Sequence, residues 1–188
     1  MKKLLIIVLP CIICANAFSK EDSPRQNAIK TTFLSWFTGS CKISYERAVF
    51  SNQTIEFTGG YIGFGWDKWE NNPRGYTARY AHKLILFGQN SQPLTGFYLR
   101  PELIYSDFHY NRQNGNERIL SRMGSACFTV GYQYAIRRLV ADCFFGSGYA
   151  WGKAADTNYQ HGFMLWDYGG NNNKNIALTF GMKLGIIF

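Results

Sequence analysis

The stretch IALTFGMKLGIIF, residues 176–188, decides the fold. Successive side chains of an extended strand point to opposite sides, so alternate positions of this stretch form two faces. One face carries only large apolar side chains, and the other is small or polar except for Ile187. The large face consists of Ile176, Leu178, Phe180, Met182, Leu184, Ile186 and Phe188. A two-faced strand of roughly 10 residues is what the lipid-facing wall of a membrane barrel requires.

The composition of the 188-residue chain favours the same class of fold. Aromatic residues make up 17% and glycine occurs 19 times, while charged residues also reach only 17%, below the usual ~25%. This mixture suits close β packing with aromatic side chains at an interface better than it suits a helical enzyme.

The first 17 residues have the organisation of a signal peptide. Two lysines (Lys2 and Lys3) precede the apolar run Leu4–Cys14, and Ala15-Asn16-Ala17 forms an A-x-A cleavage site. The apolar run is too short for a membrane anchor, which needs ~20 residues. We therefore predict export with cleavage of residues 1–17.

The mature chain is basic without a concentrated basic patch. Removing the two leader lysines from the 20 basic residues leaves 18 against 12 acidic residues, a net charge of +6. The excess is scattered and follows no groove-like pattern, so we expect no nucleic-acid partner. Outer-membrane lipids and lipopolysaccharide are the expected partners of such a surface.

Three cysteines remain after cleavage: Cys41, Cys127 and Cys143. An odd count without C-x-x-C spacing indicates neither a disulfide framework nor a zinc site. We interpret these cysteines as small apolar wall residues, and we predict no metal and no cofactor.

Period-2 patterning recurs along the mature chain and predicts an all-β fold, an eight-stranded antiparallel up-and-down transmembrane β-barrel over residues 27–188. Residues 18–26 form a periplasmic lead-in. An even number of strands leaves both ends of the barrel on the periplasmic side. The predicted strands are Asn27–Phe37, Cys41–Phe50, Thr54–Trp66, Tyr76–Leu86, Phe97–Tyr110, Arg118–Tyr134, Leu139–Trp151 and Ile176–Phe188.

Turn-forming residues separate these strands. We expect a short turn at Gly39-Ser40 and a bulge at Gly59-Gly60. A two-residue turn at Arg137-Arg138 places Ile136 opposite Leu139, which keeps the large side chains of both strands on one face. The longest connection, residues 153–175, then lies on the outer side.

Several segments resemble a family of small Gram-negative outer-membrane β-barrels of unknown function. The resemblance rests on the signal peptide and on three segments, Asn27–Thr31, Ser44–Ala48 and Gly96–Leu103. It covers essentially the whole mature chain. It implies the fold and the outer-membrane location, and it implies no catalytic residue.

Nine charged residues fall on the predicted lumen face. An eight-stranded barrel is only wide enough inside for side chains, and buried charges need partners, so a paired polar core is expected. A narrow path for protons or ions is the alternative. Glu46, Glu56 and Glu102 are the expected acceptors for Arg79, Arg100 and Lys42. The complete set is Lys42, Glu46, Glu56, Arg79, Lys83, Arg100, Glu102, Asp142 and Lys183.

A catalytic arrangement would need a nucleophile, a base and an acid within hydrogen-bonding reach. His109 lies near Ser106 and Asp107 in the sequence. Their spacing does not match a His and a Ser two apart on one strand face, as in barrel hydrolases. We assign no catalytic residue and interpret His109 as a polar rim residue.

The last outer loop is rich in aromatic side chains. They either extend neighbouring strands above the membrane or form a binding surface for glycan or protein. The candidates are Tyr159, His161, Phe163, Trp166 and Tyr168.

The sequence thus predicts a monomeric outer-membrane barrel with a closed polar lumen and a structural, adhesive or envelope-interaction role. The barrel-assembly machinery is an expected partner through the terminal strand ending in Phe188. Two alternatives stay open: a secreted, soluble lipocalin-like barrel that binds a ligand, and an outer-membrane enzyme that hydrolyses or transfers lipid acyl chains.

Overall fold

The computed structural model describes residues 26–67, 72–88, 94–111, 117–154, 157–166 and 175–188. The expected signal peptide and all but the last residue of the expected lead-in lie outside the described residues. Within the described part no helix is long and apolar enough to cross a membrane. The elements are β1 (Asn27–Thr32), the 3-10 helix η1 (Phe33–Phe37), β2 (Thr38–Phe50), β3 (Gln53–Asp67), β4 (Arg74–Gly88), β5 (Gly96–Asn111), β6 (Arg118–Ile136), β7 (Leu139–Lys153), β8 (Met164–Trp166) and β9 (Ile176–Ile187).

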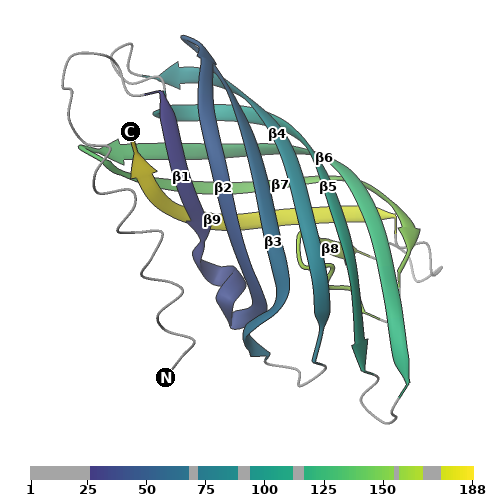
Figure 1. The fold of residues 1–188 in the computed structure, drawn as a ribbon. Helices are drawn as coiled ribbons and strands as arrows, with labels where there is room; N and C mark the ends of the chain where they lie inside the picture. The colour runs from purple at the N-terminus through teal and green to yellow at the C-terminus, as the bar shows by residue number, and fades with distance from the viewer. Residues whose placement is uncertain (1–25, 68–71, 89–93, 112–116, 155–156, 167–174) are drawn as a thin grey trace, which may run out of the picture.

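The long strands form a closed barrel in the order of the chain, as Figure 1 shows. Each of β1 to β7 pairs antiparallel with the next long strand, and β9 pairs with both β7 and β1. Asn27 and Phe188 exchange two backbone hydrogen bonds of 3.1 and 2.9 Å, which places the start of β1 beside the carboxyl terminus. The predicted all-β, eight-stranded, antiparallel up-and-down barrel is confirmed.

Alternation along β9 sorts its side chains as the sequence predicted. Phe180 is 56% exposed on the outer face, whereas Thr179 and Lys183 are each 1% exposed inside. Burial also alternates along β5 and β7. The barrel therefore has an apolar exterior and a polar interior, which is the reverse of a soluble protein.

The hairpin of β6 and β7 has the predicted register. Ile136 lies opposite Leu139, and Gln133 lies opposite Asp142 in the interior. Arg137 adopts a positive φ of 56°, which the tight two-residue connection requires.

The beginning of the barrel differs from the prediction. The first strand ends at Thr32 instead of Phe37, because the chain coils into η1 where Phe33 and Leu34 are both exposed. Two consecutive bulky side chains that both face outward cannot belong to a regular alternating strand. The predicted turn at Gly39-Ser40 is also wrong, since both residues belong to β2.

The predicted bulge at Gly59-Gly60 is wrong as well, because the register of β3 runs unbroken through both glycines. The register shifts between β2 and β3 lie between Thr38 and Ser40 and between Ala48 and Phe50. A Cβ on Gly60 would lie within 2.8 Å of the side chains of Thr77 and Lys42, so this glycine leaves room for interior side chains.

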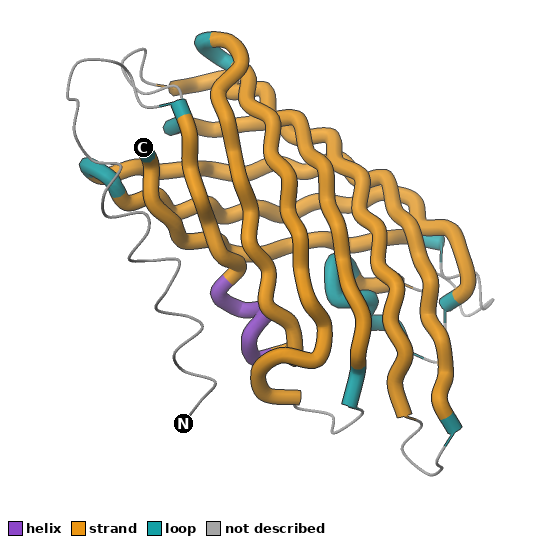
Figure 2. Tube along the Cα trace, in the orientation of Figure 1, coloured by secondary structure: helices purple, strands orange, loops and turns teal. Residues whose placement is uncertain are grey.

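The connection between β7 and β9 contains the short strand β8, which the sequence did not predict. It pairs with the first three residues of β9, from Ile176 to Leu178. In Figure 2 the loop that precedes β8 lies beside β9. Part of the longest connection is thus built into the barrel.

Candidate functional site

The structure places all nine predicted lumen charges in the interior. Eight are buried as whole residues, and the side chain of Arg79 is 8% exposed. Lys30 of β1 joins them and was missed, because the irregular end of the first predicted strand obscured its alternation. The signal was present, since Ala28, Lys30 and Thr32 alternate with outward positions.

A cluster of charges occupies the middle of the interior. The Lys30 Nζ lies 2.6 Å from Glu46 Oε2 and 3.0 Å from Asp142 Oδ2. Lys83 Nζ lies 2.8 Å from the same Asp142 oxygen. Gln133 accepts hydrogen bonds from both lysines and donates one to Glu46. The ions share partners, which compensates the loss of water around each of them.

A second group surrounds Arg100. Its Nη2 lies 2.9 Å from Glu102 Oε2, and its guanidinium stacks 4.1 Å from the centroid of the Phe144 ring. Arg79 Nη1 lies 3.4 Å from the same Glu102 oxygen. Lys183 forms an ion pair with Glu56. Glu102 therefore forms ion pairs with both arginines, as the sequence suggested.

The expected acceptor for Lys42 is not found. No carboxylate among the described residues pairs with Lys42, although the residue is only 8% exposed. The charged groups that act on Lys42 electrostatically are Arg79 and Lys183, and both are positive. The prediction that a glutamate neutralises Lys42 was wrong for the described residues, because the available carboxylates are held by other cations.

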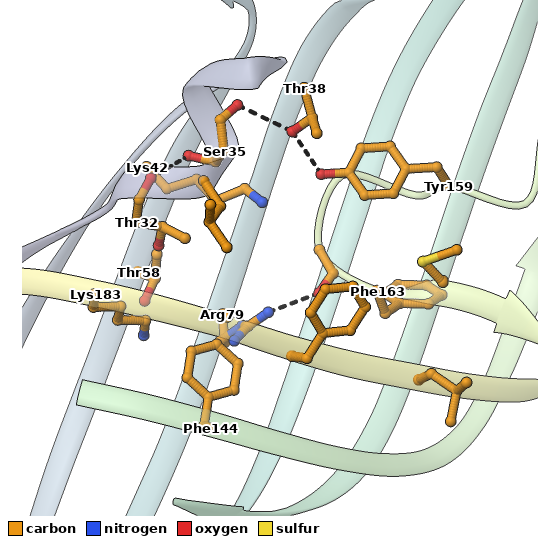
Figure 3. A pocket seen from close by; sticks show the side chains of 16 residues that line it. Thr32, Ser35, Thr38, Lys42, Thr58, Arg79, Phe144, Tyr159, Phe163 and Lys183 are labelled. Atoms are coloured by element: carbon orange, nitrogen blue, oxygen red, sulfur yellow. Dashed lines mark hydrogen bonds between the residues drawn. The ribbon is translucent and has the colours of Figure 1, made fainter. Parts of the chain in front are cut away.

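Lys42 lines a cavity of about 110 Å³ together with Arg79 and Lys183. Figure 3 shows these cations around the cavity, with Tyr159 and Phe163 contributed by the loop. Thr58 adds a hydroxyl, and Phe144 contributes an aromatic wall. The cavity therefore has a cationic inner surface.

The cavity lies at a seam in the wall, defined by residues 179–182 of β9. On one edge of β9, β8 pairs with residues 176–178 and β1 pairs with residues 183–187, so neither covers the seam. The other edge of β9 pairs continuously with β7. The interruption arises because β1 gives way to η1 after Thr32.

The loop before β8 folds inward. Tyr159 accepts or donates a 2.8 Å hydrogen bond with Thr38, and Arg79 donates to the Gly162 carbonyl at 2.7 Å. His161 and Phe163 are 4% and 2% exposed. We call residues 157–163 the plug segment, because its side chains fill the interior beside the charges.

The predicted outer aromatic surface is therefore wrong for His161 and Phe163, which are buried, and Tyr159 is half-buried. The side chains of His161 and Phe163 pack inside the barrel because burial removes their apolar surface from water. Trp166 is 55% exposed, and Tyr168 lies outside the described residues. Burial, with the Lys42 charge as a smaller cause, lowers the pKa of His161 to about 3.

The structure does not bring Ser106, His109 and Asp107 together as a catalytic Ser–His–acid arrangement. Ser106 is buried in the interior, whereas His109 and Asp107 lie on the other face of β5. Asp107 instead accepts a 2.7 Å hydrogen bond from Arg122. Among the described residues, no three His, Cys, Asp or Glu side chains come together as a possible metal site. Cys41, Cys127 and Cys143 are free thiols.

A closed eight-stranded barrel with an apolar exterior and a charged, filled interior is typical of outer-membrane barrel domains. The N-terminal β-barrel domain of Pseudomonas aeruginosa OprF, known from a crystal structure, is similar in fold. The TM-score is 0.51 at 11% sequence identity, over 88% of this chain and 98% of that chain. Residues 5–187 match the model of the DUF3575 family, described as a protein of unknown function, and the chain belongs to that family. No curated protein matches the chain.

Proposed function

We propose that the protein is a monomeric outer-membrane barrel with a closed interior, which serves envelope structure, adhesion or envelope interaction and is not an enzyme. The exposed apolar exterior is the observation that carries this proposal. Phe57, Leu103, Phe128, Phe145 and Phe180 are each more than half exposed, and they come from five different strands. Water does not tolerate so continuous an apolar surface, whereas lipid requires it.

The paired charges support a closed interior. Arg100, Lys30, Lys83 and Lys183 are among the largest fully buried side chains of the described residues, and none is more than 1% exposed. Such ion pairs hold one another in place instead of lining an open channel. A purified barrel in a planar bilayer is accordingly expected to show no conductance steps.

The orientation of the faces opposes the soluble ligand-carrying alternative. A lipocalin-like barrel holds an apolar ligand against apolar interior side chains, whereas the described interior here is charged. The alternative of a lipid-modifying enzyme is tested separately with a His109→Ala variant. Loss of a lipid modification in this variant would support the alternative, and an unchanged lipid profile would exclude it.

The proposal is tested by expression with the native leader and fractionation of the envelope. We expect the protein in the outer-membrane fraction, with faster gel migration before boiling than after, because a folded barrel resists detergent denaturation. Deletion of the terminal residue Phe188 is expected to reduce assembly, since the terminal strand is the proposed contact with the barrel-assembly machinery. Recovery as a soluble periplasmic protein would contradict the proposal.

A further inference from the structure

The cavity at the seam is bordered by side chains from both faces of the wall. Lys42 and Lys183 are interior residues, whereas Leu34 of η1, Phe180 of β9 and Met164 of β8 are 48%, 56% and 38% exposed on the outside. The same cavity thus joins cations inside the wall to apolar side chains outside it. The exposed side chains among its lining place the cavity at the wall of the barrel.

The charges around the cavity are unbalanced. Six cations and four carboxylates lie in the described interior. Glu56 holds Lys183, and Glu102 holds Arg79, which leaves Lys42 as the cation without an acidic partner among the described residues. A buried ammonium ion without a counter-charge is costly, so an anionic group in this cavity would stabilise the structure.

An apolar groove continues from the seam over the outer face. It has a volume of about 490 Å³ and shares Leu34, Phe180, Gly181 and Phe144 with the lining of the cavity. Beyond the seam it is lined by Tyr132, Phe145 and other outward side chains of β5, β6, β7 and β9. An apolar chain in the groove would therefore continue directly from a group seated in the cavity.

We infer that the seam binds an anionic lipid, with its phosphate or carboxylate head beside Lys42, Arg79 and Lys183 and its acyl chain in the outer groove. The cavity of about 110 Å³ has room for roughly three to four water-sized groups, which suits such a head. This inference rests on the proposed membrane location, because the acyl chain reaches the groove from the lipid phase. A barrel with a purely structural role does not require such a ligand.

The test uses the folded full-length mature barrel in the neutral detergent dodecyl maltoside, with dodecyl phosphate as the probe. Native mass spectrometry is expected to show one bound dodecyl phosphate per barrel. Lys42→Gln is expected to weaken binding about tenfold or more, because a charge-assisted contact is lost. Lys153→Gln, an identical change at an exposed residue, is expected to leave the affinity unchanged.

A second pair of variants tests entry through the seam. Leu34→Trp places bulk at the mouth and is expected to weaken binding of dodecyl phosphate. Leu86→Trp is the matched control, since Leu86 and Leu34 are 49% and 48% exposed but only Leu34 lines the cavity. Dodecanoate is expected to bind at the same site, because its carboxylate offers the same anionic oxygens.

Inorganic phosphate separates a lipid site from a free-anion site. We expect it to bind more weakly than dodecyl phosphate and to be insensitive to Leu34→Trp. Equal affinity for the two phosphates, or equal binding of dodecyl phosphate by the wild type and Lys42→Gln, would overturn the inference. Heat-modifiable migration and membrane fractionation of the same preparations report whether the barrel itself is intact, so failure of the lipid site is distinguishable from failure of the proposed function.

Discussion

The Lys30 ammonium lies 3.0 Å from Oδ2 of Asp142, although the two residues are 112 positions apart in the chain. Lys30 is on β1 and Asp142 is on β7, with β9 between them. Their ion pair therefore exists only after the barrel has closed. It connects the closure of the wall to the charge balance of the interior.

Asp142→Asn is expected to destabilise the barrel by about 3–5 kcal/mol, the usual cost of leaving buried charges without a partner. Lys30 and Lys83 both lose an anionic partner, and the Tyr98 hydroxyl loses a charged acceptor. Urea unfolding followed by tryptophan fluorescence measures the loss. Asp107→Asn is the control, because its pair with Arg122 is exposed, and a change of less than ~1 kcal/mol is expected. Equal effects of the two variants would contradict the importance of the buried cluster.

Gly148→Ala is expected to destabilise the barrel by about 1–3 kcal/mol or more through overpacking. Its Cβ would collide with the backbone of Ala126 and Cys127 on β6. Gly59→Ala is the matched control, since no atom lies within 4 Å of the position that its Cβ would occupy. The temperature at which heat-modifiable migration is lost compares the two variants, and an intact Gly148→Ala barrel of wild-type stability would refute the expectation.

Lowering the pH is expected to release the plug segment. His161 is held neutral because burial, with the Lys42 charge, lowers its pKa from 6.5 to about 3. In the released segment His161 binds a proton below pH ~6.5, whereas in the packed segment it does not. The packed position of the plug segment therefore has its full stability above that pH and loses stability as the pH falls toward 3. At pH 5 the loss is about 2 kcal/mol.

Hydrogen exchange of the plug-segment amides between pH 7.5 and 5, corrected for intrinsic rates, measures this release. His161→Gln is expected to remove the pH dependence. His82→Gln should keep it, because His82 hydrogen bonds to Gln53 on β3 and does not contact the plug segment. The same pH dependence in the His161 variant would assign the effect to another group.

Thr38→Val is expected to loosen the plug segment by about 1 kcal/mol, the usual value of a hydrogen bond. The change removes the 2.8 Å hydrogen bond between Thr38 and Tyr159 and also the 3.0 Å hydrogen bond that Thr38 donates to the Ser35 carbonyl in η1. Faster amide exchange in residues 159–163 would show the effect. Thr31→Val removes a comparable hydrogen bond, to the Lys42 carbonyl at 3.0 Å, and should leave exchange in the plug segment unchanged.

The wall of the barrel could be predicted because the alternation of apolar and polar residues within each strand shows which side faces outward. The alternation of Phe180 with Thr179 and Lys183 needs no knowledge of the rest of the chain. The two-residue turn after Ile136 then fixed a register that both strands satisfied. Local pattern and global fold agree in these segments.

The seam and the plug segment could not be predicted in this way. The end of β1 depends on outward packing of Phe33 and Leu34, which a period of two cannot describe. Burial of His161 and Phe163 depends on space between strands that are distant in sequence. Partner assignment for Lys42 failed for the same reason, since several cations compete for each carboxylate.

The uneven pairing of β9 has a mechanical consequence. A cylinder that is continuously bonded except along one line bends most easily along that line. We therefore expect local opening of the wall to be easiest at residues 179–182, where one edge of β9 has no strand partner. The barrel is therefore expected to deform along this one line of its wall before it deforms elsewhere.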